Sequence, residues 1–212
     1  MEERRILDLL VIRYPVLSSA KEEILIAFEL LCNCYENKGK LLICGNGGSA
    51  SDAEHIVGEL MKNFSKDRNL DAKIKTDLIA VSYELGCQLA NALQPALPAI
   101  ALTSHTALNT AFMNDVNPEL IFAQQVLGYG NPGDILLGIS TSGNAKNVLY
   151  AFVTARALGM KTLGLTGKTG GRFNEYCDIV IHVPASVTHE IQELHLPVYH
   201  ALCQMLEEYF WK

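Results

Sequence analysis

The hydrophobic pattern of the first forty residues is helical. Leu7, Leu10 and Val11 recur at spacings of three and four, which place side chains on one face of a helix. Pro15 interrupts the pattern, because proline lacks an amide hydrogen and clashes with the preceding helical turn. We therefore expect a helical lead-in over residues 1–39.

From Lys40 onward, short apolar runs alternate with helical patterns. Short runs bounded by Gly, Pro or polar residues are typical of buried parallel strands, and their alternation with helices predicts a doubly wound α/β fold. The expected strands are 41–44, 99–102, 135–139, 162–165 and 179–183, and the expected helices between and after them are 49–64, 144–158 and 187–212.

Residues 65–98 interrupt this alternation. A charged piece, 66–77, is followed by an apolar piece with helical spacing, 78–93. We interpret the segment as an insertion. A length of 212 residues suits one domain, so we expect a single domain over 1–212, with its sheet in 40–212.

Charge and cysteine content narrow the classes of function. Seventeen basic and 23 acidic residues give a net charge of −6, and basic side chains are not clustered, so direct binding of nucleic acid is not expected. No run approaches the ~20 apolar residues of a spanning helix, so no membrane association is expected. Six scattered cysteines without a C-x-x-C pair fit a reducing, cytoplasmic location.

A glycine-rich loop, residues 45–48, joins the first expected strand to a helix. Glycines permit tight turns, and the free amides of a helix N-terminus can bind an anion or sugar hydroxyls. Gly45, Gly47 and Ala50 also fit the loose G-x-G-x-x-G/A dinucleotide pattern. That pattern needs a strand with an acidic end about twenty residues later, which is missing, so no nucleotide cofactor is expected.

A second loop carries three adjacent hydroxyls, Ser140, Thr141 and Ser142, between an apolar strand and a helix. Hydroxyls and helix N-terminal amides can hold a phosphate without a lysine. A small phosphorylated molecule is the expected ligand. The alternative is ordinary capping of the helix by Ser142 or Asn144.

Two helices carry candidate acid–base or metal-binding side chains. His55 and Glu59 are spaced i, i+4, so they lie on one helix face and could bind a metal, move protons, or form a simple surface pair. In the last helix, Gln192 and His200 lie about 12 Å apart along an ideal axis, a separation that full side-chain reach, a bend at Pro197 or different subunits could bridge. For His195 a packed core role is favoured.

Taken in order, these motifs resemble the sugar isomerase (SIS) family, most closely its phosphoheptose isomerase branch. The resemblance runs from about Lys40 to the C-terminus. It is carried by the glycine loop with the 52–59 segment, the 138–144 loop, Leu165-Thr166-Gly167, and Ile191-Gln192-Glu193 with the two following histidines.

The resemblance implies a fold, an activity and a site. The fold is a flavodoxin-like sheet of five parallel strands flanked by helices, in a homotetramer whose active sites lie where subunits meet. The activity is interconversion of sedoheptulose 7-phosphate and D-glycero-D-manno-heptose 7-phosphate through an enediol. Implied roles are phosphate binding for Ser140, Thr141 and Ser142, sugar binding for Asn46, Gly47, Ser49 and Asp115, acid–base catalysis for Glu59 and His200, and zinc binding, in members that carry it, for His55, Glu59, Gln192 and His200.

The chain departs from that family pattern in three places. Ala145 stands where many members have a further serine in the phosphate loop. His189 and Glu190 stand where relatives often have Asp or Ala followed by Arg. The 65–98 segment is also longer than is typical of the family. A carboxylate in place of an arginine reverses a local charge and bears on substrate choice.

Two other functions fit the same motifs. One is a binding protein like the SIS relative that associates with the replication initiator DnaA, but that relative lacks the histidine at position 200. The other is a phosphosugar sensor without turnover. The presence of His200 favours the enzyme.

Overall fold

The computed structural model describes residues 2–211 and contains a sheet of five parallel strands. The strands lie in the order β2-β1-β3-β4-β5, which is the flavodoxin-like doubly wound order. This confirms the fold class expected from the sequence. The strands are β1 Leu41–Gly45, β2 Ala99–Ala101, β3 Ile135–Ser140, β4 Lys161–Thr166 and β5 Ile179–His182.

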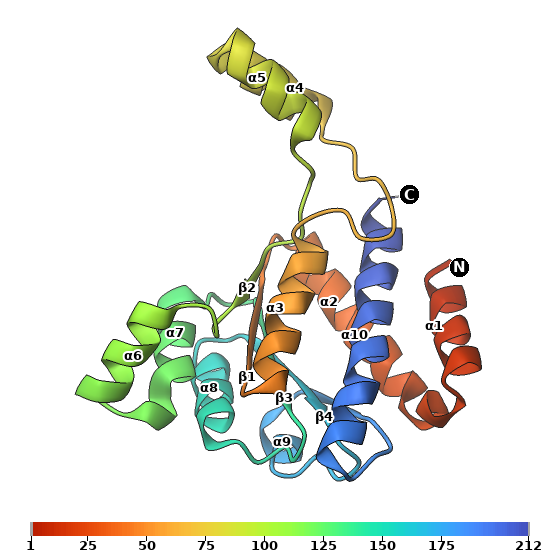
Figure 1. Cartoon of the computed structure of the whole chain (residues 1–212), viewed down its shortest axis with the longest axis vertical. Coiled ribbons are helices and arrows are strands. Elements are labelled where there is room, and N and C mark those ends of the chain that lie inside the picture. The colour runs from red at the N-terminus through yellow and green to blue at the C-terminus, as the bar shows by residue number, and fades with distance from the viewer. Residues whose placement is uncertain (1, 212) are drawn as a thin grey trace.

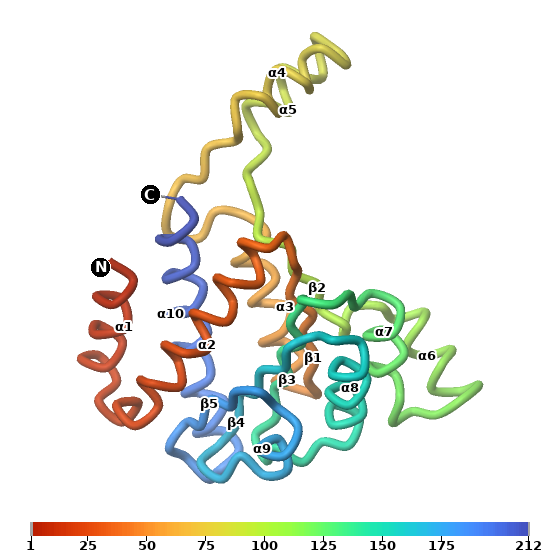
Figure 2. The backbone as a smooth tube through the Cα atoms, turned by 180° about the vertical axis from the view of Figure 1, so that it is seen from behind, coloured from red at the N-terminus to blue at the C-terminus, as the bar shows by residue number. Residues whose placement is uncertain are grey.

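Helices flank the sheet on both faces and precede it at the N-terminus (Figures 1 and 2). Pro15 begins a 3-10 turn between the first two helices, so the predicted interruption is confirmed. The α-helices are α1 Glu2–Arg13, α2 Lys21–Glu36, α3 Gly48–Leu60, α4 Ala72–Val81, α5 Tyr83–Ala92, α6 Thr106–Asp115, α7 Ile121–Tyr129, α8 Lys146–Ala157, α9 Phe173–Tyr176 and α10 Thr188–Phe210, and the 3-10 helices are η1 Pro15–Ala20 and η2 Pro118–Leu120.

Two hydrophobic layers enclose the sheet, because successive strand side chains point to opposite faces. Leu41 and Ile43 of β1 belong to the core that includes α1, α2, α3 and α10. Leu42 and Cys44 belong to the core that includes α7, α8 and α9. All five residues of β1 are buried, which explains why its apolar pattern is continuous.

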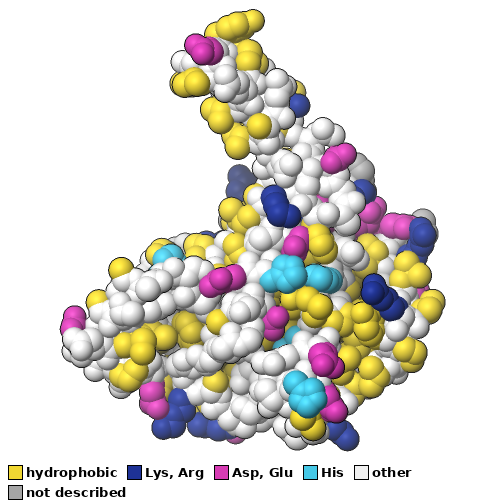
Figure 3. Space-filling view, in the orientation of Figure 1, with side chains coloured by type: hydrophobic (Ala, Val, Ile, Leu, Met, Phe, Trp, Pro, Cys, Tyr) yellow, Lys and Arg dark blue, Asp and Glu magenta, His cyan; other side chains and the backbone are white. Residues whose placement is uncertain are grey.

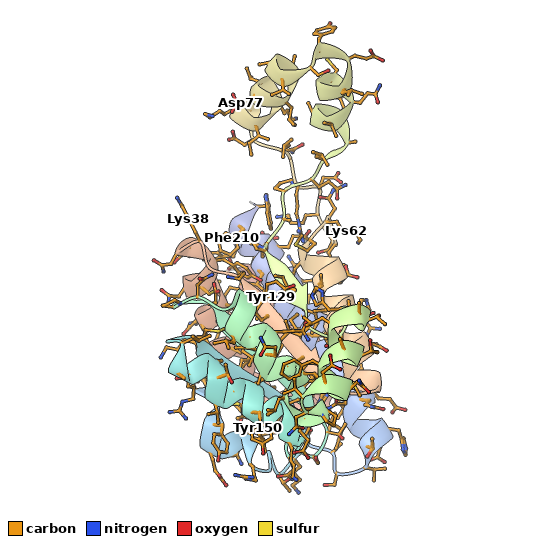
Figure 4. The ribbon with its side chains drawn as sticks, turned by 90° about the vertical axis from the view of Figure 1, so that its left-hand side faces the viewer. Lys38, Lys62, Asp77, Tyr129, Tyr150 and Phe210 are labelled. Carbon is orange, nitrogen blue, oxygen red and sulfur yellow. The ribbon has the colours of Figure 1, made fainter. Side chains whose placement is uncertain are left out.

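The segment 65–98 contains a helical hairpin, α4 and α5, that projects from the body of the molecule (Figure 1). The apolar piece with helical spacing, 78–93, is divided between α4 and α5, because Ser82 adopts an extended backbone and caps the start of α5. The two helices pack closely: a Cβ on Gly86 would lie 2.2 Å from the Leu78 carbonyl oxygen. In Figure 4, Asp77 lies on this hairpin, whereas Lys62 and Phe210 lie near its base.

A buried ion pair fastens the start of the insertion to the last helix. Arg68 Nε donates to Glu207 Oε1 at 2.8 Å, and neither side chain is exposed. Arg68 also donates to the carbonyl oxygens of Leu60 at 2.7 Å and Glu59 at 2.8 Å. These carbonyls lie at the end of α3, where intrahelical donors are missing, so Arg68 fixes the end of α3 against α10.

Among residues 2–211, no helix has the length and apolar character required to cross a bilayer.

Candidate active site

The glycine loop and the hydroxyl loop lie side by side, because they follow the adjacent strands β1 and β3. In this all-parallel sheet, β1 and β3 flank the point where the order of successive strands reverses, and ligands of such folds bind there. The side chains of Asn46 in the glycine loop and Asn147 in the first turn of α8, the helix that follows the hydroxyl loop, share amide hydrogen bonds of 3.0 and 2.8 Å in opposite directions. The loops therefore form one surface at the carboxyl edge of the sheet.

The glycine loop exposes its polar groups at this surface. Gly47, at φ +57°, is the residue preceding α3, a backbone conformation that glycine adopts without strain. Asn46 and Gly47 are exposed, whereas Ser49 is only 3% exposed. Asn46 and Gly47 are thus accessible to a ligand, and the Ser49 side chain packs inside the helix start.

The hydroxyl loop is held by the turn that follows β4. Gly167 donates its amide to Thr141 O at 3.1 Å, and Phe173 donates its amide to Gly143 O at 3.1 Å. Gly143 adopts φ +64°, and a Cβ there would lie 1.9 Å from Gly170 O, so only glycine fits. Residues 167–171, which connect β4 to α9, therefore brace this loop.

Neither Ser142 nor Asn144 caps the start of α8 with its side chain, so the alternative interpretation of the hydroxyl loop as an ordinary helix cap is wrong. Ser142 Oγ accepts from the amide of Asn144, while the residue preceding α8 is Ala145, which makes no side-chain cap. The first turn of α8, which follows the hydroxyl loop, therefore has no side-chain cap on its amides. Ser140 is 8% exposed, Thr141 is half-buried and Ser142 is exposed.

Three acid–base side chains meet between α3 and α10. His55 Nε2 lies 3.1 Å from Glu59 Oε1 and 3.4 Å from His200 Nε2. The imidazole of His55 is partly exposed and the Glu59 side chain is 13% exposed. Figure 3 shows histidine side chains gathered at the centre of this face. The structure thus brings His55 and Glu59 together with His200, which the sequence alone could not establish.

The surroundings of His200 favour its neutral form. Burial lowers the pKa of His200 below its ordinary value, the neighbouring His55 lowers it further, and Glu59 opposes both. The Phe64 ring packs against the half-buried His200 ring, with 5.4 Å between the ring centres. A neutral imidazole can accept or donate a proton.

Two further residues join this cluster and were not among the expected site residues. Tyr199 Oη lies 2.9 Å from His55 Nδ1 and donates to Asp52 Oδ1 at 3.3 Å. Burial raises the pKa of Asp52, although the Tyr199 hydrogen bond and His55 act in the opposite direction. The i, i+3 spacing of Asp52 and His55 was the only sequence signal for this arrangement.

Two expected site residues lie elsewhere within one chain. Gln192 reaches the glycine loop: its Nε2 lies 2.6 Å from the position a Cβ on Gly48 would occupy. Asp115 is exposed at the end of α6, at the periphery of the molecule, where its carboxylate accepts from Asn114 at 2.8 Å. Within residues 2–211, neither residue is hydrogen-bonded to His55, Glu59 or His200.

The cluster has the chemistry of a zinc site but not its complete form. Zinc takes imidazole nitrogen and carboxylate oxygen at ~2.0–2.2 Å, so neighbouring ligands of a tetrahedral site lie about 3.3 Å apart. The distances of 3.1 and 3.4 Å from His55 Nε2 to Glu59 and His200 match that spacing. Within the described part of the chain, however, no three His, Cys, Asp or Glu side chains are arranged as a finished metal site.

His195 is a core residue rather than part of the site. It is fully buried, and burial lowers its pKa to about 4, against a smaller opposing effect of the Thr166 backbone. Its neutral ring therefore packs between α10 and the sheet, as favoured from the sequence.

Comparison with known proteins agrees with this geometry. The SIS domain model matches residues 11–77 and 75–167. Phosphoheptose isomerase of Campylobacter jejuni is 43% identical over 190 residues, which cover 90% of this chain and 88% of that protein. The phosphoheptose isomerase of Helicobacter pylori is 41% identical over 194 residues, 92% of this chain and 88% of that protein.

Solved structures give the same result. The phosphoheptose isomerase of Francisella tularensis superposes with a TM-score of 0.76 at 34% identity, covering 92% of this chain and 91% of that one. The phosphoheptose isomerase of Neisseria gonorrhoeae superposes with a TM-score of 0.73 at 31% identity, covering 98% and 100%. The chain therefore belongs to the SIS domain family, in its phosphoheptose isomerase branch.

Proposed function

We propose that the protein isomerises a ketose phosphate to an aldose phosphate, with sedoheptulose 7-phosphate as substrate and D-glycero-D-manno-heptose 7-phosphate as product. The observation that carries this proposal is the meeting of His55, Glu59 and His200 between α3 and α10. Similarity to phosphoheptose isomerases over nearly their whole length supports the same substrate.

The hydroxyl loop and the start of α8 supply the phosphate site in this proposal. Ser140, Thr141 and Ser142 donate hydroxyl hydrogens to phosphate oxygens, and the uncapped amides of α8 add further donors at the positive end of the helix dipole. The sugar then extends toward the glycine loop, where Asn46 and Gly47 are exposed.

Glu59 and His200 perform the proton transfers. Conversion of a ketose to an aldose moves a proton from C1 to C2 and the carbonyl from C2 to C1. Glu59 takes the C1 proton, which forms the enediol, and returns a proton to C2. His200 exchanges the hydroxyl proton between the two oxygens. Positioned acid–base groups of this kind contribute ~10²–10⁴-fold to a rate.

Zinc is part of the proposal, held by His55, Glu59 and His200 with Gln192 as the fourth ligand. When bound, the metal would polarise the substrate carbonyl. The donor types and two of the ligand-to-ligand distances support it, while Gln192 lies beside Gly48 in the single chain.

A homotetramer with active sites between subunits is the assembly we propose. A groove of about 360 Å³ between α1 and α10 is lined by apolar residues such as Leu9 and Leu196, and it reaches His200. An element of a second subunit in this groove would border the site, and residues placed elsewhere in one chain, such as Asp115, could then complete it. We place the protein in the cytoplasm, and six free cysteines support this.

The experiment that tests the function follows conversion of sedoheptulose 7-phosphate by ¹H NMR, with added zinc and with chelator. Appearance of the aldose phosphate signal supports the proposal. A matched Ser140→Ala variant should convert the same substrate with a raised KM. Binding of sedoheptulose 7-phosphate without any aldose product under both metal conditions would instead indicate a sensor.

A further inference from the structure

The cluster between α3 and α10 includes a chain of hydrogen bonds from Asp52 through Tyr199 to His55. The proposed proton transfers assign no role to Asp52 or Tyr199. Tyr199 Oη lies between two groups, 2.9 Å from His55 Nδ1 and 3.3 Å from Asp52 Oδ1. Tyr199 is 2% exposed, so water does not compete for its hydroxyl. The two partners therefore have to share one hydroxyl proton.

The carboxylate has the stronger need for that proton. Tyr199 is the donor recorded for Asp52, and Asp52 Oδ2 is buried without a hydrogen-bond partner. If the Tyr199 proton went to His55 instead, a partly buried carboxylate would keep no recorded donor, which is costly. The hydroxyl proton thus belongs to Asp52, and the Tyr199 oxygen is left to accept.

An accepting Tyr199 oxygen fixes the tautomer of His55. The ring nitrogen that faces it, Nδ1, must then carry a hydrogen, and in a neutral imidazole the other nitrogen carries the lone pair. That other nitrogen, Nε2, faces Glu59 Oε1 at 3.1 Å and His200 Nε2 at 3.4 Å.

The opposite tautomer, with its hydrogen on Nε2, also has an acceptor, because Glu59 Oε1 lies 3.1 Å from Nε2. The two tautomers are therefore compared. With a hydrogen on Nε2, His55 would donate to Glu59, but Tyr199 would have to donate to Nδ1 and Asp52 would lose its donor. With a hydrogen on Nδ1, Glu59 still has Lys62 Nζ 3.8 Å from its Oε2, and His200 can donate to His55. Among the described residues, Glu59 Oε2 has no hydrogen-bond partner, and Glu59 Oε1 then faces the Nε2 lone pair. This tautomer therefore leaves a place between Glu59 and His55 for a cation or a substrate hydroxyl.

We infer that Asp52 and Tyr199 are positioning residues that hold His55 with its proton on Nδ1, so that Nε2 presents a lone pair to the space shared with Glu59 and His200. This inference rests on the proposed function, because a lone pair there is what a bound cation or a substrate hydroxyl requires. Outer partners of this kind orient a ligating imidazole and raise its basicity.

The tautomer of His55 can be observed directly, without substrate or metal. Histidine labelled with ¹⁵N reports the tautomer in solid-state NMR, since a protonated ring nitrogen and a lone-pair nitrogen have clearly separate shifts. The His55 signal is assigned by its loss in His55→Gln. In the metal-free wild-type protein we expect a protonated Nδ1 and an unprotonated Nε2.

Three variants test the causes. Tyr199→Phe should leave a mixture of tautomers, and Asp52→Ala should shift the proton to Nε2, because Tyr199 is then free to donate to Nδ1. Asp52→Asn keeps an acceptor oxygen and should restore the wild-type tautomer. The matched control is Tyr35→Phe, which removes a buried hydroxyl that has no hydrogen-bond partner.

Zinc affinity, measured by competition with a chelating dye, gives the second readout. Tyr199→Phe and Asp52→Ala should weaken zinc binding by ~10–100-fold, and Tyr35→Phe should not weaken it. A wild-type His55 protonated on Nε2, or a Tyr199→Phe variant with wild-type tautomer and wild-type zinc affinity, would overturn the inference. If the protein lacks isomerase activity, the tautomer measurement still decides this inference by itself.

Discussion

His200 lies at the centre of the proposed chemistry, because it contacts His55 and was the residue that distinguished an enzyme from a non-catalytic relative. We predict that His200→Asn lowers kcat by ~10²–10⁴-fold. The amide keeps a similar size but cannot exchange protons near neutral pH. Sedoheptulose 7-phosphate binding, measured by calorimetry, should change little, since the phosphate contacts are elsewhere. A kcat within a few-fold of wild type would contradict the role.

His195 makes stability depend on pH. Its pKa is about 4 in the folded protein and ordinary when unfolded, so between these values the unfolded chain binds more protons. The contribution of neutral His195 to the free energy of unfolding is therefore fully present above about pH 6.5. It falls by on the order of 3 kcal/mol as the pH decreases through 4.

Urea unfolding across this pH range measures the effect. His195→Gln should be less stable at neutral pH but should lose less stability on acidification. His189→Gln, at an exposed site, should keep the wild-type slope. Equal slopes for wild type and His195→Gln would rule out this histidine as the cause.

Side-chain roles were only partly predictable at the residue scale. The i, i+4 spacing of His55 and Glu59 correctly placed them on one helix face, as their 3.1 Å contact confirms. Tyr199 was missed because it meets Asp52 from a position 147 residues away, and no local pattern encodes such a contact. Its apolar ring also fits the hydrophobic spacing of α10, which indicates a core residue.

At the scale of helices and strands, the buried carboxylate of Glu207 links α10 to the insertion and, through Arg68, to the end of α3. Burial raises the pKa of Glu207, but hydrogen bonds from Ser65, the backbone of Phe64 and Arg68 outweigh it, so the pKa is lower than usual. The carboxylate thus stabilises the fold above its unfolded pKa, and this contribution disappears as acid protonates it.

We predict that Glu207→Gln lowers the free energy of unfolding by about 3–5 kcal/mol, because it leaves the buried guanidinium of Arg68 without its counter-charge. Urea unfolding at neutral pH measures this. The control is Lys73→Gln, which breaks an ion pair exposed on the hairpin and should cost less than about 1 kcal/mol. Similar losses in both variants would refute the structural role of this pair.

The sheet was more predictable than the insertion, for a physical reason. Strands buried on both faces, such as β1 and β3, are buried at every position, and only Ser140 at the end of β3 is polar, so their apolar runs are clear. In α4 no residue is buried, so the core does not impose a helical pattern on it. The break at Ser82 depends on a local cap within an otherwise apolar stretch, and it was therefore missed.

For the whole molecule, the strand order predicts the place of the site. The order 2-1-3-4-5 places the glycine and hydroxyl loops next to each other, after β1 and β3, and the reciprocal bonds of Asn46 and Asn147 join the glycine loop to the start of α8. Both loops could be predicted from the sequence, but the bonds between Asn46 and Asn147 could not, because these residues lie 101 positions apart. Asp115 remains a proposal at this scale, because it depends on an assembly of subunits.

Deuterium exchange by the Glu59→Gln variant tests the central claim most directly. In D₂O the wild-type protein should convert sedoheptulose 7-phosphate and place deuterium on C2 of the aldose phosphate, as ¹H and ²H NMR can measure. Glu59→Gln should bind the same sugar phosphate yet show neither conversion nor exchange at C1. Exchange at the wild-type rate in Glu59→Gln would contradict the assignment of Glu59 as the base.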